Sequence, residues 1–232
     1  MFSIYQKTDR FLNIIVTHEC NKQCPFCIDK YRGLSEYLTI DSLNKILLFA
    51  KSKNIDDILI TGGEPTLHPN IVYISSLIKE AGFRTILTTN YTSPCIVKEL
   101  DGIIDCFNIS FYNQPELPKQ KNFKSNLTLH ALINKKQLAT KKELDLFIAK
   151  YKGDILLKFS TLSVCNSWTK ENQAVDYLDE LDSEHTILFN EILGQIYKGA
   201  IIKRHDKIMN KNADQSYKAH LNGKIIKSWN RG

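Results

Sequence analysis

Short apolar runs alternate with segments of helical spacing as far as about residue 184, and this alternation restricts the possible folds more than any other feature. The runs have the composition of buried strands, and the segments between them repeat their apolar residues about every three to four positions. We predict strands at residues 11–17, 57–61, 84–89, 103–110, 126–133 and 155–161, and helices at 40–53, 71–81, 94–100, 141–151 and 171–181. Strands that alternate with helices favour a parallel sheet covered by helices, either a whole or partial barrel or an open doubly wound sheet.

Residues at the helix ends support these assignments. Thr39 directly precedes the first predicted helix and is a typical N-cap. Thr140 and Glu143 have the spacing of a capping box at the start of the helix over 141–151. Gly82 follows the helix over 71–81, where a glycine commonly ends a helix.

The chain changes character after about residue 184, where short apolar runs continue and the alternation with helices stops. Asn222-Gly223 lies between two such runs and predicts a β-hairpin. We therefore divide the chain into a core of residues 1–183 and a C-terminal β extension of residues 184–232 that packs on the core.

The net charge of +6 comes from the end of the chain. Residues 198–232 contain nine Lys and Arg and two acids, a balance of +7, which leaves residues 1–197 at −1. This uneven distribution argues against a nucleic-acid-binding surface over the whole protein. The basic extension could attract an anionic substrate, or it could be an ordinary solvated lysine face.

The sequence contains no apolar run of the length that spans a membrane, and its first residues lack the order of a signal peptide. Its six cysteines do not form the dense framework of a disulfide-stabilised secreted domain, because three of them crowd into residues 20–27. These observations predict a cytoplasmic protein with no membrane partner.

Cys20, Cys24 and Cys27 form a C-x3-C-x2-C loop directly after the first predicted strand. Three thiolates on one short loop suit three irons of a [4Fe–4S] cluster and leave the fourth iron without a protein ligand. The alternative is a zinc site, whose fourth ligand would be His18 or a distant cysteine. The remaining cysteines are predicted not to be ligands: Cys95, Cys106 and Cys165.

A second motif, Gly62-Gly63-Glu64-Pro65, follows the second predicted strand at the end where parallel α/β folds bind ligands. With both motifs in this order, the chain resembles the radical SAM superfamily over residues 8–182, nearest to its molybdenum-cofactor-cyclase-like branch without auxiliary clusters. The resemblance implies an α/β fold, a partial (βα)6 TIM barrel with a short C-terminal β extension. It also implies a [4Fe–4S] cluster and S-adenosylmethionine as cofactors.

The resemblance further implies which residues bind these groups. The three loop cysteines would hold the cluster, and its open iron would bind the amino and carboxylate groups of S-adenosylmethionine. The other expected cofactor-binding residues are Phe26 against the adenine, Gly62, Gly63 and Glu64 near the methionyl ammonium, Thr89 and Ser110 near its carboxylate, and His130 and Phe159 toward the ribose or adenine. Expected substrate contacts are Asn190, Glu191, Lys203 and Arg204. Phe26 and His130 could instead be ordinary packed residues. The fifth predicted strand also departs from this branch, because it carries Thr128 and His130 where the branch often has a basic residue that binds the methionyl carboxylate.

The implied activity is reductive cleavage of S-adenosylmethionine to a 5′-deoxyadenosyl radical, which abstracts a hydrogen atom from a substrate. We expect a small-molecule substrate, such as a phosphorylated compound or a nucleotide, and an electron donor of the flavodoxin or ferredoxin type. One alternative is a peptide or protein substrate, as for peptide maturases and glycyl-radical activases. A more remote alternative is a non-catalytic metal-binding module.

Overall fold

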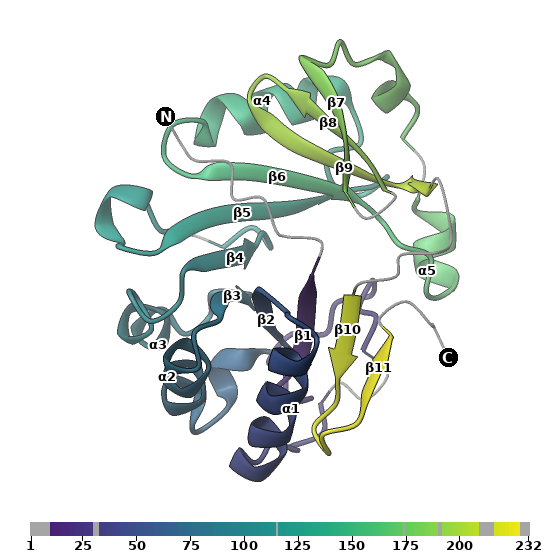
Figure 1. Ribbon diagram of the computed structural model, residues 1–232. Coiled ribbons are helices and arrows are strands. Elements are labelled where there is room, and N and C mark those ends of the chain that lie inside the picture. The colour runs from purple at the N-terminus through teal and green to yellow at the C-terminus, as the bar shows by residue number, and fades with distance from the viewer. Residues whose placement is uncertain are drawn as a thin grey trace.

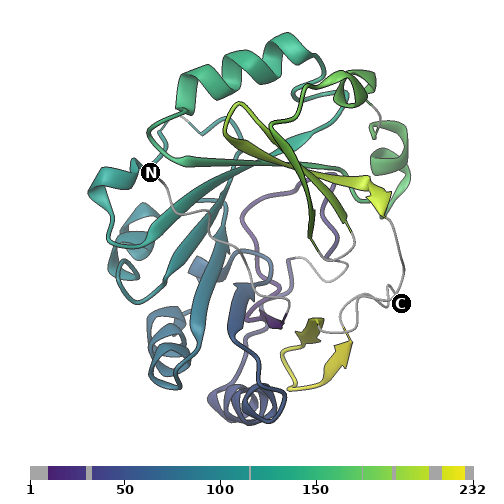
Figure 2. The ribbon, with the colours of Figure 1, turned by 45° about the horizontal axis from the view of Figure 1, so that its top comes forward.

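A computed structural model describes residues 10–29, 33–114, 116–173, 175–189, 192–208 and 216–227. Its centre is a curved sheet with helices on the outside (Figure 1 and Figure 2). Six parallel strands pair in chain order: β1 (Phe11–Ile15), β2 (Asp57–Thr61), β3 (Arg84–Thr89), β4 (Cys106–Ser110), β5 (Asn126–Ile133) and β6 (Leu156–Thr161). All six predicted strands are thus confirmed, with β1, β4 and β6 shorter than predicted.

Four helices cover the outside of this sheet: α1 (Ile40–Ser52), α2 (Ile71–Glu80), α3 (Pro94–Glu99) and α4 (Lys141–Tyr151). Two short 3-10 turns, η1 (Pro65–Leu67) and η2 (Gln120–Asn122), lie in the connections. The predicted caps are present, because Thr39 accepts a hydrogen bond from the Ser42 N–H at 3.2 Å, and Thr140 and Glu143 form the reciprocal capping box. No described helix has the length and apolar character to cross a membrane.

The helix predicted over residues 171–181 is wrong. The structure has a shorter helix, α5 (Ser167–Glu171), followed by a 3-10 turn, η3 (Asp176–Glu180). The Asn166 side chain accepts a hydrogen bond from the Thr169 N–H at 2.9 Å, so α5 begins before the predicted start. Asn172 is the C-cap and donates from its side chain to the Trp168 carbonyl at 2.8 Å, which ends the helix after one and a half turns or less.

The C-terminal strands extend the sheet at both edges (Figure 1). Three of them, β7 (His185–Phe189), β8 (Ile192–Tyr197) and β9 (Ala200–Ile208), continue it beyond β6, to which β9 is parallel. At the other edge, β10 (Ser216–Ala219) is parallel to β1, and β11 (Ile225–Lys227) is antiparallel to β10. The hairpin predicted at Asn222-Gly223 is the β10–β11 turn.

The described parts of the two edge strands, β7 and β11, do not pair with each other, so the barrel is partial. The division of the chain at residue 183 stays a prediction.

The two faces of the sheet carry different side chains, because successive strand residues point to opposite faces. One set points outward and is buried against the helices, as where the Phe147 ring of α4 packs on Phe159 with ring centroids 5.5 Å apart. The other set points into the curve of the sheet and includes polar residues such as His130, Lys158 and Lys203. The apolar core therefore lies between the sheet and the helices, and these polar side chains lie on the inner face.

Candidate functional site

The three predicted cluster cysteines lie on one loop that leaves the carboxyl end of β1. Their side chains are half-buried, and the Cys27 N–H donates to the Cys24 carbonyl at 3.1 Å, which closes a tight turn. Burial raises the pKa of the Cys20 thiol, and the negative charges of Glu64 and of the other two thiolates raise it further. The three sulfurs therefore repel one another when ionised. A positive metal centre bound to all three would remove this repulsion, so the loop fits an iron–sulfur cluster.

The side-chain arrangement fits a cluster better than a zinc ion. Within the described part of the chain, no three His, Cys, Asp or Glu side chains come close enough together to ligate one metal ion. Zinc needs its ligands around a single point, whereas each cysteine of a cluster binds an iron of its own. His18, which we considered as a fourth zinc ligand, lies with Nδ1 2.9 Å from Asp29 Oδ2, a contact that metal-binding histidines also make, so its role stays a prediction.

The Gly62-Gly63-Glu64-Pro65 turn lies against the backbone that leads into the cysteine loop. The Gly63 N–H donates to the Thr17 carbonyl at 2.8 Å, and the Glu64 N–H donates to the Glu19 carbonyl at 2.7 Å. A Cβ at Gly63 would lie 2.7 Å from the His18 carbonyl oxygen and closer still to that of Glu19, and a Cβ at Gly62 would clash with the Thr17 carbonyl. The two glycines thus allow the turn to position the cysteine loop, whereas their expected approach to the methionyl ammonium stays a prediction.

Glu64 is buried at the carboxyl end of β2, with 1% of its surface exposed. Its Oε1 accepts hydrogen bonds from the Thr66 N–H at 3.1 Å and from the Thr66 and Thr89 hydroxyls, each at 2.7 Å. Its Oε2 accepts from the Asn90 N–H at 2.7 Å. The carboxylate therefore joins the ends of β2 and β3. Because the Thr89 hydroxyl donates its proton to Glu64 here, its contact with the methionyl carboxylate stays a prediction.

Two asparagines that we did not select from the sequence connect this network to the cysteine loop. Asn90 Nδ2 donates to Asn21 Oδ1 at 2.8 Å, and Asn21 Nδ2 donates to the Thr92 hydroxyl at 2.6 Å. Asn21 directly follows Cys20, and Asn90 directly follows Thr89. Their positions next to predicted site residues are the signal that could have identified them.

Aromatic side chains pack on the cysteine loop. The Phe26 ring stacks on Tyr112 with centroids 6.1 Å apart and planes 9° apart, and it contacts Trp168 at a centroid distance of 6.0 Å. Burial and the neighbouring Cys24 thiolate raise the pKa of the Tyr112 phenol, which also bonds to the Ser110 hydroxyl. Ser110 thus faces the cysteine loop through Tyr112, a residue that no sequence pattern marked. The expected contacts of Phe26 with adenine and of Ser110 with the carboxylate stay predictions.

The segment after β6 also contacts the cysteine loop. Cys165 Sγ lies 3.8 Å from the carbonyl oxygens of Phe26 and Cys27, and Asn166 Nδ2 donates to the Pro25 carbonyl at 2.8 Å. Cys165 therefore contacts loop backbone, and its exclusion from the cluster ligands stays a prediction. The other two cysteines lie on separate elements, the exposed Cys95 on α3 and the buried Cys106 on β4.

Basic side chains gather on the inner face of β5, β6 and β9. The strand register pairs His130 with Lys158 and Ser160 with Lys203, and His130 Nε2 lies 2.9 Å from Ser160 Oγ. Burial and the charges of Lys158, His205 and Lys203 lower the pKa of His130 well below its usual value. Lys203 therefore lies on the inner face, as a substrate contact requires, and the role of His130 stays a prediction.

The structure does not bring the other expected residues to this face. Arg204 points to the opposite side of β9 and forms an ion pair with Asp179 at 3.2 Å, because neighbouring strand residues alternate in direction. For the same reason Phe159 is fully buried against α4, which removes it from the expected contact with adenine. The expected substrate contacts Asn190 and Glu191 lie outside the described residues.

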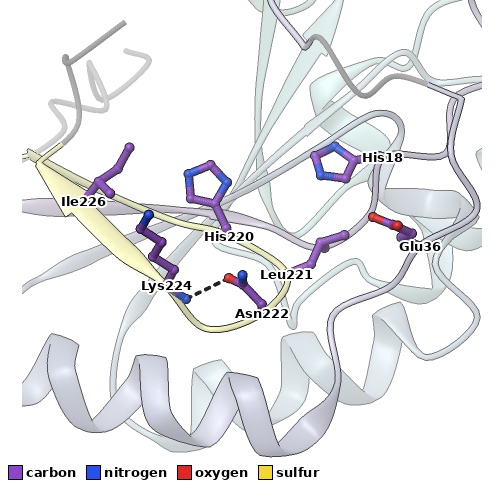
Figure 3. A pocket seen from close by; sticks show the side chains of 7 residues that line it. All are labelled: His18, Glu36, His220, Leu221, Asn222, Lys224 and Ile226. Carbon is purple, nitrogen blue, oxygen red and sulfur yellow. Dashed lines mark hydrogen bonds between the residues drawn. The ribbon is translucent and has the colours of Figure 1, made fainter. Parts of the chain in front are cut away.

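A pocket of about 380 Å³ lies between the turn of the β10–β11 hairpin and the start and end of the cysteine loop (Figure 3). Two imidazoles, a carboxylate and an ammonium group line it together with amide and apolar side chains: His18, Glu36, His220, Leu221, Asn222, Lys224 and Ile226. Burial and the charges of Lys218, His18 and Lys224 lower the pKa of His220. The pocket contains none of the expected cofactor-binding or substrate residues.

Comparison with known proteins agrees with this geometry. Residues 14–113 match the family model described as Radical SAM superfamily. A protein of Methanocaldococcus jannaschii named as a glycyl-radical enzyme activating enzyme is 38% identical over 76 residues, which cover 33% of this chain and 30% of that protein. A protein of Saccharolobus islandicus named as a GTP 3′,8-cyclase is 36% identical over 81 residues, which cover 34% of this chain and 26% of that protein.

The overall fold is also similar to that of a solved enzyme structure. Streptococcus suis SuiB bound to S-adenosylmethionine matches with a TM-score of 0.61 at 13% identity, over 94% of this chain and 60% of SuiB. At this identity the likeness shows a shared fold. The alignments with the two curated relatives span less than a third of the length of either protein.

Proposed function

We propose that this chain, whose residues 14–113 match the Radical SAM superfamily model, is an enzyme that removes a hydrogen atom from a substrate held inside the partial barrel. When bound, the [4Fe–4S] cluster and S-adenosylmethionine supply the 5′-deoxyadenosyl radical for this step. The observation that carries the proposal is the position of the cysteine loop, which backbone hydrogen bonds hold against the Gly62-Gly63-Glu64-Pro65 turn at the open end of the strands.

The chain's own residues prepare this site in three ways. Cys20, Cys24 and Cys27 provide the thiolates that hold the cluster. The buried Glu64 network fixes the ends of β2 and β3 beside them. The rings of Phe26 and Tyr112 stack beside the loop, where apolar side chains would help to exclude water from a reactive carbon radical.

The substrate that the site favours is a small molecule with an anionic group. The supporting observation is the basic inner face of β5, β6 and β9, which lies on the same side of the sheet as a substrate inside the barrel. A peptide or protein substrate is the second candidate. It finds support in the similarity to the M. jannaschii protein named as an activating enzyme, whereas the S. islandicus relative is named for a reaction on GTP.

Product analysis under strictly anaerobic conditions tests the proposed activity. The full chain is reconstituted with iron and sulfide, reduced with dithionite and incubated with S-adenosylmethionine, and 5′-deoxyadenosine and methionine are quantified. We expect both products in equal amounts without any added substrate, and neither in Cys24→Ala. A protein with an intact cluster that forms no 5′-deoxyadenosine would refute the proposal. Metal analysis separates the non-catalytic zinc module, because a cluster requires about four irons per chain.

A further inference from the structure

Three neighbouring strands bring basic side chains to one region of the inner face. The register pairs His130 of β5 with Lys158 of β6, and it pairs Lys203 of β9 with the next inward-facing residue of β6. His205 follows Lys203 by two positions and so points to the same face. The His205 backbone N–H donates to a β6 hydroxyl at 2.7 Å, which fixes this part of β9 against β6. The four side chains are therefore presented by a rigid part of the sheet.

Lys158 is a buried lysine, and a buried cation requires a compensating charge. Burial lowers the pKa of Lys158, and in the described part of the chain neither Lys158 nor His130 forms an ion pair with a carboxylate. Burial and the nearby Lys158 lower the pKa of Lys203 to about 7. Cations withdrawn from water destabilise the protein unless an opposite charge accompanies them. An anionic ligand at this position would supply that charge.

We propose that the inner-face basic cluster, defined as His130, Lys158, Lys203 and His205, binds a phosphoryl group of the substrate, a refinement that rests on the proposed function. A phosphoryl group carries between one and two negative charges at neutral pH and offers several acceptor oxygens, so donors from three strands can bind it together. A carboxylate carries one charge on two oxygens and matches fewer of these donors. Lysine is also a common phosphate-binding residue.

The direction of the strands gives this site a role in orienting the substrate. β5, β6 and β9 are parallel to one another and belong to the same parallel series as β1, whose carboxyl end continues into the cysteine loop. A substrate held by its phosphoryl group on these strands can therefore extend toward the loop, where the hydrogen atom is removed. The cluster fixes one end of the substrate and the cofactor meets the other.

Lys158→Met is the informative variant, because methionine has a similar length and carries no charge. Its matched control is Lys198→Met, which also replaces one lysine by methionine, at an exposed ion pair with Asp145 outside the inner-face basic cluster. Reconstituted wild type and both variants are titrated calorimetrically with inorganic pyrophosphate and, separately, with succinate. We expect wild type and Lys198→Met to bind pyrophosphate equally, and Lys158→Met to bind it about ten- to hundredfold more weakly.

Three further measurements separate phosphoryl binding by Lys158 from a purely structural role of this side chain. In the absence of any anion, Lys158→Met should have a melting temperature equal to or above that of wild type, because a desolvated charge has been removed. A lower melting temperature with weaker binding would mean that Lys158 is structural, and equal binding of succinate and pyrophosphate would overturn the phosphoryl assignment. Unchanged pyrophosphate binding in Lys158→Met would overturn the site itself. Substrate-free formation of 5′-deoxyadenosine should persist in Lys158→Met, and its absence from wild type would instead refute the proposed function.

Discussion

Replacement of Glu64 by Gln should destabilise the protein even when no cluster and no S-adenosylmethionine are bound. The Glu64 carboxylate accepts three hydrogen bonds at Oε1 and one at Oε2, all from groups of the protein. Gln has nearly the same shape, but it replaces one acceptor oxygen by an NH₂ donor. With the amide oxygen toward Thr66 and Thr89, the nitrogen must face the Asn90 N–H, which now lies 2.7 Å from an acceptor.

The size of the effect follows from this geometry. One hydrogen bond to a charged group is lost, which costs about 1.5–3 kcal/mol. The Asn90 N–H and the new amide donor then face each other in a buried site, because Glu64 has only 1% of its surface exposed. Water therefore cannot readily enter to accept hydrogen bonds from these two donors. An unsatisfied buried donor costs about 1–3 kcal/mol. We therefore expect the free energy of unfolding to fall by about 2.5–6 kcal/mol in Glu64→Gln, less where the site relaxes.

Urea denaturation of the metal-free protein, followed by circular dichroism, measures this difference. The control is Glu36→Gln, which removes an exposed carboxylate and should change the free energy of unfolding by less than about 0.5 kcal/mol. Thr89→Val, which removes one donor to Glu64, should give an intermediate loss. A Glu64→Gln variant with wild-type stability that loses only affinity for S-adenosylmethionine would refute the structural argument and assign Glu64 to the methionyl ammonium.

Three other predictions concern the cysteine loop, the glycine turn and Asp105, which directly precedes β4. Cys24→Ala should abolish the broad visible absorption of the reconstituted protein and Cys165→Ala should retain it, whereas the reverse result would change the ligand assignment. Gly63→Ala should lower the melting temperature and the bound iron together, because its methyl group meets the backbone of residues 18–19; wild-type iron content in this variant would contradict that mechanism. Burial raises the pKa of Asp105, but hydrogen bonds from Lys79 and Thr85 outweigh it, so the net pKa lies below the usual 3.8. The stability that Asp105 adds is therefore present at neutral pH and is lost as the pH falls below that usual value, so Asp105→Asn should lower the urea midpoint at pH 7 and have little effect at about pH 2; an equal loss at both values would point to packing instead.

The parts of the fold that could be predicted are those with a local physical cause. The strands β1–β6 and helices α1–α4 follow from apolar spacing, and Thr39 and Thr140 begin their helices through contacts within four residues. The helix over 171–181 could not be predicted, because the caps at Asn166 and Asn172 outweighed the apolar spacing beyond them. Local pattern is therefore sufficient for the barrel, and it fails where short polar side chains compete for the backbone.

The candidate site divides in the same way. The cysteine loop and the glycine turn are motifs in the sequence, whereas the contacts of Tyr112 and Asn21 depend on which strand ends lie side by side. Phe159 was selected because it lies near the end of a strand, and Arg204 because it lies in the basic extension, in both cases without regard to the face of the sheet. Side chains in a strand alternate between the two faces, and the sequence already shows the polar Lys158 next to the apolar Phe159. This alternation would have assigned Phe159 to the helix-covered face and excluded it as a cofactor contact.

The pairing of β1 with β10 has a consequence for protein synthesis. β1 leaves the ribosome long before β10, yet the two strands are adjacent in the sheet. Until residues 216–219 have been translated, one edge of β1 keeps unpaired N–H and C=O groups, which attract strands of other chains. The nascent protein is therefore prone to aggregate until β10 has been made, and a chaperone that covers this edge of β1 until then would raise the fraction of chains that fold.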